Sequence, residues 1–111
     1  MTDPERLLFV EDAENWRAVM RATLEGEKEF SIVFSVEEAK AAIESGTAFT
    51  RIITDGLEGE WELVMTLAQT AGIPLKVLSG SMDVLKKAKS LGIEAVNKED
   101  VTAGTVQIED L

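Results

Sequence analysis

The stretch Leu7-Leu8-Phe9-Val10-Glu11-Asp12 decides the fold class, because four consecutive apolar residues run directly into two acids. An unbroken apolar run is typical of a β-strand that is buried on both faces, as in a parallel sheet. Four other short, mainly apolar segments follow along the chain. The five predicted strands are residues 7–10, 30–34, 51–54, 75–78 and 95–96.

Stretches with the apolar spacing of amphipathic helices lie between these segments. In the first stretch, one face carries Trp16, Val19, Met20, Thr23 and Leu24. Four such stretches are each followed by a glycine that is suited to end a helix, namely Gly26, Gly46, Gly72 and Gly92. The second helix is predicted to begin with a capping box of Ser35 and Glu38, and the fourth with Ser81 as its cap.

Strand and helix patterns alternate five times, and no hairpin signal interrupts them. This alternation predicts right-handed crossovers and a parallel sheet that is covered by helices on both faces. We therefore expect a single α/β domain over residues 1–111, with a doubly wound (βα)5 fold. Gly104 interrupts the last segment, so the fifth helix should be short or irregular.

The composition excludes several classes of chemistry. The 111 residues include no histidine, cysteine or tyrosine, and the formal net charge is -10. A disulfide framework, a zinc finger and a thiolate nucleophile are excluded, and any bound metal should be a hard cation on oxygen ligands. The acidic balance opposes nucleic-acid binding. The chain has neither a membrane-spanning segment nor a secretory signal, so we expect a cytoplasmic protein.

Charged and polar residues follow the predicted strands at the edge where parallel-sheet proteins bind ligands. Glu11 and Asp12 follow the first strand, Asp55 the third and Ser79 the fourth, while Lys98 comes shortly after the fifth. Clustered carboxylates repel one another unless a cation lies among them, and aspartate is a known phosphoryl acceptor. The set therefore suits magnesium-dependent phosphoryl transfer, with the hydroxyl and the ammonium neutralising phosphoryl oxygens.

Each residue of this set also has a simpler interpretation. Asp12 could only cap the first helix, and Asp55 could only form a turn before Gly56. Ser79 could belong to an ordinary turn between strand and helix, and Lys98 could be a solvated surface lysine. For Trp16 and Trp61 we expect core packing.

Four strand-end motifs together resemble the receiver domain of two-component response regulators. They are Leu8-Phe9-Val10-Glu11-Asp12, Ile52-Ile53-Thr54-Asp55, Val77-Leu78-Ser79-Gly80 and Ala95-Val96-Asn97-Lys98, and they cover nearly the whole chain. The resemblance implies a CheY-like, flavodoxin-like fold with sheet order 2-1-3-4-5. It implies that Asp55 is the phosphoacceptor, that Ser79 is the switch hydroxyl, and that Lys98 pairs with the phosphoryl group. It also implies a Mg²⁺ site made by Asp12, Asp55, the Leu57 backbone carbonyl and Glu11 acting through water.

Three departures from the family pattern indicate an atypical, pared-down receiver. The loop after Asp55 is shorter than usual, Glu99 replaces the proline that follows the family lysine, and Ala95 stands at the position of the switch aromatic. Leu57, two residues after the acceptor, is expected to shield an acyl phosphate and slow its hydrolysis.

The expected function is therefore that of a stand-alone receiver, which accepts a phosphoryl group on Asp55 from a histidine kinase or a phosphotransfer protein. Apart from its own phosphorylation and dephosphorylation, we expect no enzyme activity. One alternative is a pseudo-receiver that acts as an interaction scaffold without phosphorylation. A small magnesium-dependent phosphohydrolase ranks lower, because Leu57 occupies the place of that class's second aspartate.

Residues 76–98 form a basic segment of an otherwise acidic chain, with five lysines against two acids. Lys86, Lys87 and Lys89 could simply form a solvated helix face. In receivers this region is the usual surface for output and dimer contacts, so the resemblance implies an acidic protein partner there. A second copy of the chain is another possible partner, and we expect a monomer or a weak homodimer.

Overall fold

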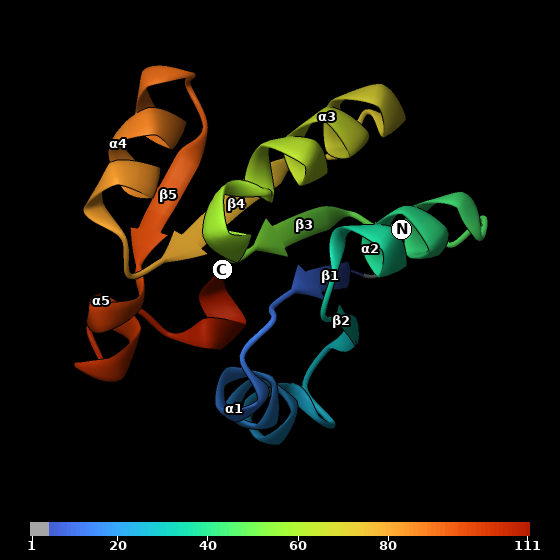
Figure 1. Cartoon of the computed structure of the whole chain (residues 1–111). Coiled ribbons are helices and arrows are strands. Elements are labelled where there is room, and N and C mark those ends of the chain that lie inside the picture. The colour runs from blue at the N-terminus through green and yellow to red at the C-terminus, as the bar shows by residue number, and fades with distance from the viewer. Residues whose placement is uncertain (1–4) are drawn as a thin grey trace.

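Strands and helices alternate along the chain as the sequence pattern predicts, in a computed structural model that describes residues 5–111 (Figure 1). The strands are β1 Arg6–Val10, β2 Glu29–Val33, β3 Arg51–Thr54, β4 Leu75–Ser79 and β5 Glu94–Asn97. The helices are α1 Glu14–Leu24, α2 Val36–Glu44, α3 Trp61–Ala71, α4 Met82–Ser90 and α5 Lys98–Thr102, with 3-10 turns η1 Leu57–Gly59 and η2 Ile108–Asp110.

The five strands form one parallel sheet in the order β2-β1-β3-β4-β5, which confirms the predicted flavodoxin-like topology. The order reverses beside β1, because the chain passes from β2 across β1 to β3. In register, Val10 at the end of β1 lies opposite Thr54 at the end of β3. The residues that follow these two strands therefore emerge side by side at the carboxyl edge of the sheet.

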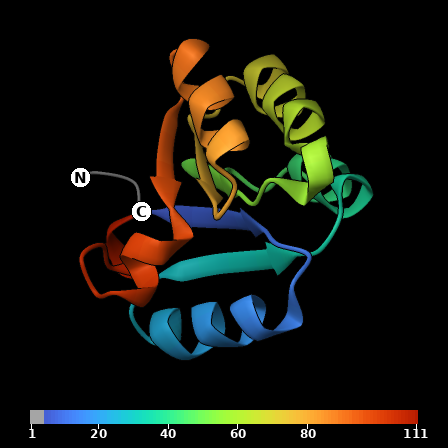
Figure 2. The same cartoon turned by 60° about the vertical axis from the view of Figure 1, so that its left-hand side comes forward.

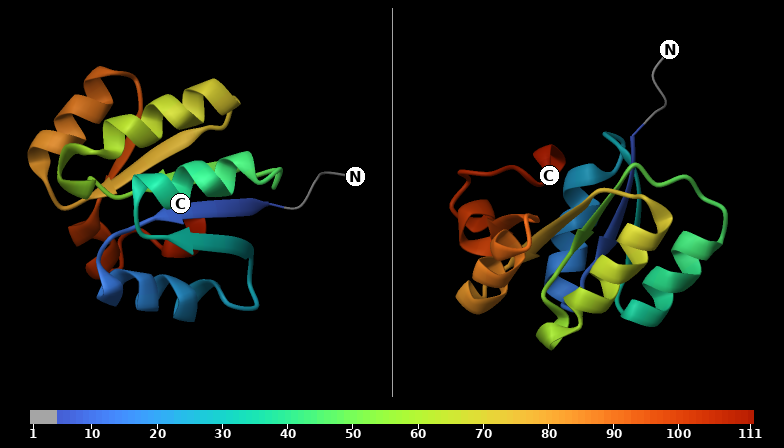
Figure 3. Two further views of the ribbon diagram at one scale, coloured as in Figure 1. Left: turned by 45° about the vertical axis from the view of Figure 1, so that its right-hand side comes forward. Right: turned by 90° about the horizontal axis from the view of Figure 1, so that it is seen from above.

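Helices cover both faces of the sheet, with α1 and α5 on one side and α2, α3 and α4 on the other (Figures 2 and 3). The alternation of side chains along β1 divides the core accordingly. Leu7 and Phe9 pack in the cluster that includes residues of α1, whereas Leu8 and Val10 pack in the cluster with residues of α2 and α3. Trp61 is 2% exposed and joins α3 to β4 and α4, which matches its predicted place in the core.

Most of the predicted helix ends are found. The Ser35 hydroxyl accepts a hydrogen bond from Glu38 N at 3.2 Å, and the Glu38 carboxylate accepts one from Phe34 N at 2.8 Å. The interpretation of Asp12 as a helix cap is wrong, because the N-cap position of α1 is occupied by Ala13, whose side chain makes no capping hydrogen bond. The longest helices, α1 and α3, have 11 residues each, and no helix within residues 5–111 could cross a membrane.

The fifth helix is short, as predicted, and the chain that follows it turns back to fill the core. Ile108 is 4% exposed and Leu111 is 1% exposed, and both pack in the cluster that contains Met20 and Leu24 of α1. The Arg51 guanidinium donates a hydrogen bond to the Leu111 carbonyl. The C-terminal segment thus provides apolar surface that the short helix does not.

Candidate functional site

Three carboxylates meet at the carboxyl edge of the sheet, where β1 and β3 end. The sheet pairing continues beyond these strands, because Glu11 N donates to Val33 O at 2.9 Å and Asp55 N donates to Val10 O at 2.7 Å. These bonds fix the backbone that carries Glu11 and Asp55. One carboxylate oxygen from each of Glu11, Asp12 and Asp55 lies within 4.8 Å of the other two.

Lys98, the first residue of α5, reaches this cluster. Its Nζ lies 2.8 Å from Asp55 Oδ1 and 2.8 Å from Glu11 Oε1, and its side chain is only 15% exposed. Glu99 causes no detour, because the Asn97 side chain accepts a hydrogen bond from Glu99 N at 2.9 Å and α5 begins at once. The interpretation of Lys98 as a solvated surface lysine does not match this position.

The carboxylates differ in their electrostatics. Burial raises the pKa of Glu11 to about 7, and the neighbouring Asp55 charge adds to this while Lys98 opposes it. Burial also acts to raise the pKa of Asp55, but the hydrogen bond and the charge of Lys98 outweigh it, so this pKa lies below its usual value. Asp55 is therefore ionised at neutral pH, whereas Glu11 changes its protonation near neutrality.

The donor set fits a hard divalent cation. Oxygen ligands of octahedral Mg²⁺ at about 2.1 Å from the metal lie at most about 4.2 Å apart, close to the 4.8 Å limit of this cluster. Glu11 Oε1 is buried with no hydrogen-bond partner among the described residues, so its ion pair with Lys98 is its only polar contact there. Asp12 is exposed, so its carboxylate is accessible to an ion from solvent.

Ser79 lies beside the cluster rather than in it. Its side chain is buried at the end of β4, and its Oγ accepts a hydrogen bond from Ser81 N at 3.1 Å. A Cβ on Gly56 would lie 3.2 Å from Ser79 Oγ, so the glycine after Asp55 allows the hydroxyl to approach the loop that follows β3. Among residues 5–111, Ser79 makes no hydrogen bond to Asp55 or Lys98.

Both polar groups of the Leu57 backbone form hydrogen bonds in the loop that follows Asp55. Leu57 N donates to Asp55 Oδ2 at 3.2 Å, and the Leu57 carbonyl accepts a hydrogen bond from Glu60 N at 3.0 Å. Leu57 and Glu58 both have positive φ, at 49° and 54°, which is uncommon outside glycine. The Leu57 side chain is 5% exposed and packs in the core, so the expected shield over an acyl phosphate is not formed by this side chain.

Two residues of α1 that we had not assigned to the site also contact it. The Arg17 guanidinium donates to the backbone carbonyls of Glu11 and Asp12, at 3.1 Å and 2.8 Å. Trp16 packs against the core as predicted, and its ring centroid also lies 4.9 Å from Lys98 Nζ. Neither contact could be predicted from the periodic pattern, because Arg17 reaches back over five or six residues and Trp16 meets a lysine that is distant in the sequence.

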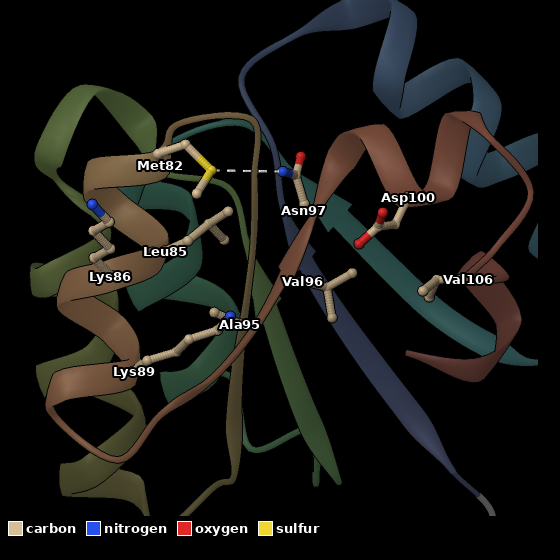
Figure 4. Close-up of a pocket in the computed structure, with 9 residues that line it drawn as sticks. All are labelled: Met82, Leu85, Lys86, Lys89, Ala95, Val96, Asn97, Asp100 and Val106. Carbon is tan, nitrogen blue, oxygen red and sulfur yellow. Dashed lines mark hydrogen bonds between the residues drawn. The ribbon is translucent and has the colours of Figure 1, made fainter.

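A groove lies between α4 and β5, on the basic face predicted from the lysine count (Figure 4). It has a volume of about 400 Å³ and is lined by Met82, Leu85, Lys86, Lys89, Ala95, Val96, Asn97, Asp100 and Val106. Lys87 pairs with Glu62 of α3 at 3.0 Å. Within residues 5–111, Lys86 and Lys89 form no ion pair, so their charges are available at the groove.

The fold is shared with solved receiver structures. A response regulator receiver protein from Sinorhizobium medicae WSM419 is 18% identical with a TM-score of 0.70, covering 96% of this chain and 91% of its own. A CheY-like receiver domain protein from Methanospirillum hungatei JF-1 is 22% identical with a TM-score of 0.70. The match covers 97% of this chain and 87% of that protein. An adenylate cyclase from Rhodopirellula baltica is also similar in fold, at 24% identity and a TM-score of 0.73. The match covers 92% of this chain and 84% of that protein.

The likeness to the two receiver structures confirms the resemblance to receiver domains at the level of the fold. No family model matches the sequence, and no curated protein matches it. Because all three identities are below 25%, the shared fold does not by itself establish a shared activity. The function has to be inferred from the residues at the site.

Proposed function

We propose that this chain is a magnesium-dependent receiver domain that accepts a phosphoryl group on Asp55 from a histidine kinase or a phosphotransfer protein. The observation that carries the proposal is the ion pair of Asp55 with Lys98, 2.8 Å apart, next to the acidic residues Glu11 and Asp12. This arrangement combines a nucleophile, a cation and a candidate metal site at one edge of the sheet.

The chemistry follows from the state of the Asp55 carboxylate. Because its pKa is lowered, it is ionised and can attack the phosphorus of a phosphohistidine. The new P–O bond forms as the P–N bond breaks, and the histidine nitrogen keeps the electron pair. Lys98 then lies beside the phosphoryl oxygens and offsets part of their charge.

A bound Mg²⁺ supplies further neutralisation of the phosphoryl charge. We assign its ligands to Asp12, Asp55 and the Leu57 carbonyl, with Glu11 acting through water. The Leu57 carbonyl already accepts one hydrogen bond, from Glu60 N, and has a second lone pair for a metal. Ser79 is assigned as the switch hydroxyl, which moves from its contact with Ser81 N toward the phosphoryl group.

The proposed output is contact with an acidic protein partner on the face of Lys86, Lys87 and Lys89. Lys86 and Lys89, which form no ion pair within residues 5–111, line the groove between α4 and β5 together with several apolar side chains. They support this assignment, because such a surface favours a negatively charged partner with an apolar side chain. The chain itself remains a monomer or a weak homodimer.

The test is a titration with Mg²⁺, followed by beryllofluoride as a mimic of the acyl phosphate. Amide NMR shifts centred on Asp55, Ser79 and Lys98 are expected, and Asp55→Asn should abolish the response to beryllofluoride. Asp83→Asn, an exposed aspartate of α4, is the matched control and should respond as the wild type does.

The alternatives give different results in the same experiment. No response to millimolar Mg²⁺ would contradict the receiver and support a pseudo-receiver scaffold, an alternative favoured by Ala95 and Glu99. Steady release of inorganic phosphate from small phosphoesters would instead support a phosphohydrolase.

A further inference from the structure

We propose that Arg17 is a positioning residue for the metal site, because it holds the loop between β1 and α1 in the conformation that brings Glu11 and Asp12 to Asp55. This inference rests on the proposed function, in which these carboxylates bind Mg²⁺. It concerns a residue outside the acidic cluster that acts only through the backbone of that cluster.

The loop needs such support because it carries two neighbouring negative charges next to a third. Lys98 forms ion pairs with Glu11 and Asp55, but Asp12 forms no ion pair within residues 5–111. The N-cap residue of α1 is Ala13, which has no side-chain cap, so the usual means of fixing a loop before a helix is absent here. Within residues 5–111, the one hydrogen bond that a loop carboxylate accepts from the backbone of this loop is the weak bond from Ala13 N to Glu11 Oε2, at 3.2 Å.

Arg17 provides the missing support from the second turn of α1. A single guanidinium nitrogen, NH1, donates to the carbonyl of Glu11 at 3.1 Å and to that of Asp12 at 2.8 Å. Because two consecutive carbonyls are directed toward one donor, the peptide planes that set the directions of both side chains are fixed.

The guanidinium is in turn held from the other side. Its central carbon lies 5.7 Å from the centroid of the Phe34 ring, which follows β2 and is 54% exposed. Phe34 N is fixed by the Glu38 carboxylate of the α2 capping box. A planar guanidinium can stack on this ring and donate to both carbonyls at once. The ammonium of a lysine cannot make this combination of contacts in the same geometry.

Positioning and simple charge predict opposite effects of removing Arg17. A positive charge near a cation site repels the cation, so if only charge mattered, loss of Arg17 would strengthen Mg²⁺ binding. If Arg17 positions the loop, its loss weakens Mg²⁺ binding, because the carboxylates must be ordered when the metal binds. The direction of the change therefore separates the two roles.

The experiment measures the Mg²⁺ dissociation constant by calorimetry for the wild type, Arg17→Gln and Arg17→Lys. Arg21→Gln is the matched control, since it removes the same charge one turn further along α1, where the side chain is exposed. We expect about tenfold weaker binding in Arg17→Gln, equivalent to roughly one lost hydrogen bond to a charged group, and an intermediate value in Arg17→Lys. Arg21→Gln should bind at least as tightly as the wild type.

A second measurement uses the protein without metal. In EDTA, the amide resonances of Asp12 and Ala13 should move or broaden in Arg17→Gln and stay in place in Arg21→Gln. If Arg17→Gln does not fold, Phe34→Leu removes the ring and keeps the guanidinium, and it should weaken Mg²⁺ binding severalfold.

The inference is overturned if Arg17→Gln binds Mg²⁺ as tightly as the wild type or more tightly. A lower melting temperature with unchanged affinity in the folded protein would likewise leave Arg17 with only a structural role. Failure of the proposed function looks different, because the wild type itself would then bind no Mg²⁺.

Discussion

Asp55 and Glu11 share one lysine, yet their pKa values move in opposite directions. Burial acts to raise both pKa values. At Asp55 the hydrogen bonds from Lys98 and Leu57 N and the Lys98 charge outweigh it, whereas at the fully buried Glu11 the contacts with Lys98 do not. Their convergence could be predicted, since residues after neighbouring parallel strands meet at one sheet edge. The position of the Arg17 side chain could not be predicted, because it depends on that side chain folding back over the loop between β1 and α1.

Glu11 should make the metal-free protein less stable as the pH rises. Its pKa is about 7 when folded and 4.5 in the usual case, so the folded state binds more protons between these values. The contribution of Glu11 to the free energy of unfolding is fully present below pH 4.5 and is lost as the pH rises past 7. Its upper limit is about 3 kcal/mol. Urea unfolding in EDTA at several pH values measures it, and an unchanged pH profile in Glu11→Gln would contradict this assignment.

Removing the Lys98 charge should destabilise the fold. In Lys98→Met, Glu11 and Asp55 lose their shared cation while they remain largely buried, which we expect to cost about 2 kcal/mol. Added Mg²⁺ should recover part of that loss, because it supplies positive charge to the same acids. Thermal and urea unfolding test this, with Lys86→Met as the control; equal stability of the two variants would argue against the shared ion pair.

At the scale of elements, the sequence predicts the regular parts of the fold well and the C-terminal segment poorly. The strand at residues 51–54 is found as predicted, and the second strand is displaced by one residue, to Glu29–Val33. Phe34 leaves that strand because its N–H is bound by Glu38. Residues 103–111 have no helical or strand period, so only contacts distant in the sequence determine their path.

This C-terminal segment should contribute strongly to stability. Ile108 is 4% exposed in the core beside α1, and Ile108→Ala should cost about 2–4 kcal/mol through lost burial and the cavity left behind. Gln107→Ala, at an exposed neighbour, should change the free energy of unfolding by less than about 0.5 kcal/mol. Chemical denaturation compares the two, and similar small losses would mean that the segment is not part of the core.

At the scale of the whole molecule, charge is distributed unevenly. The net charge is -10, while residues 76–98 carry five lysines against two acids, and three of these lysines, Lys86, Lys87 and Lys89, lie on α4. The groove between α4 and β5 lies on this basic face (Figure 4). Composition predicts such a face, but the groove depends on how α4, β5 and α5 pack and could not be predicted from it.

Association between copies should therefore depend on this face and on salt. At low ionic strength, sedimentation should detect weak dimerisation of the basic face with acidic surface of a second copy, and added salt should remove it. The double variant Lys86→Glu and Lys89→Glu should sediment as a monomer throughout. Equal association of the variant and the wild type would place the contact elsewhere.

The two tryptophans provide separate optical reporters of binding and folding. Trp61 is enclosed by α3, β4 and α4, whereas the Trp16 ring lies 4.9 Å from Lys98 Nζ. Indole emission responds to a nearby cation, so in the folded Trp61→Phe variant the emission of Trp16 would respond to movement of Lys98. A Trp16→Phe variant would report only loss of the core. Tryptophan fluorescence of the Trp61→Phe variant could thus follow ligand exchange at the carboxyl edge. Fluorescence of the Trp16→Phe variant could follow unfolding, and neither measurement needs an attached dye.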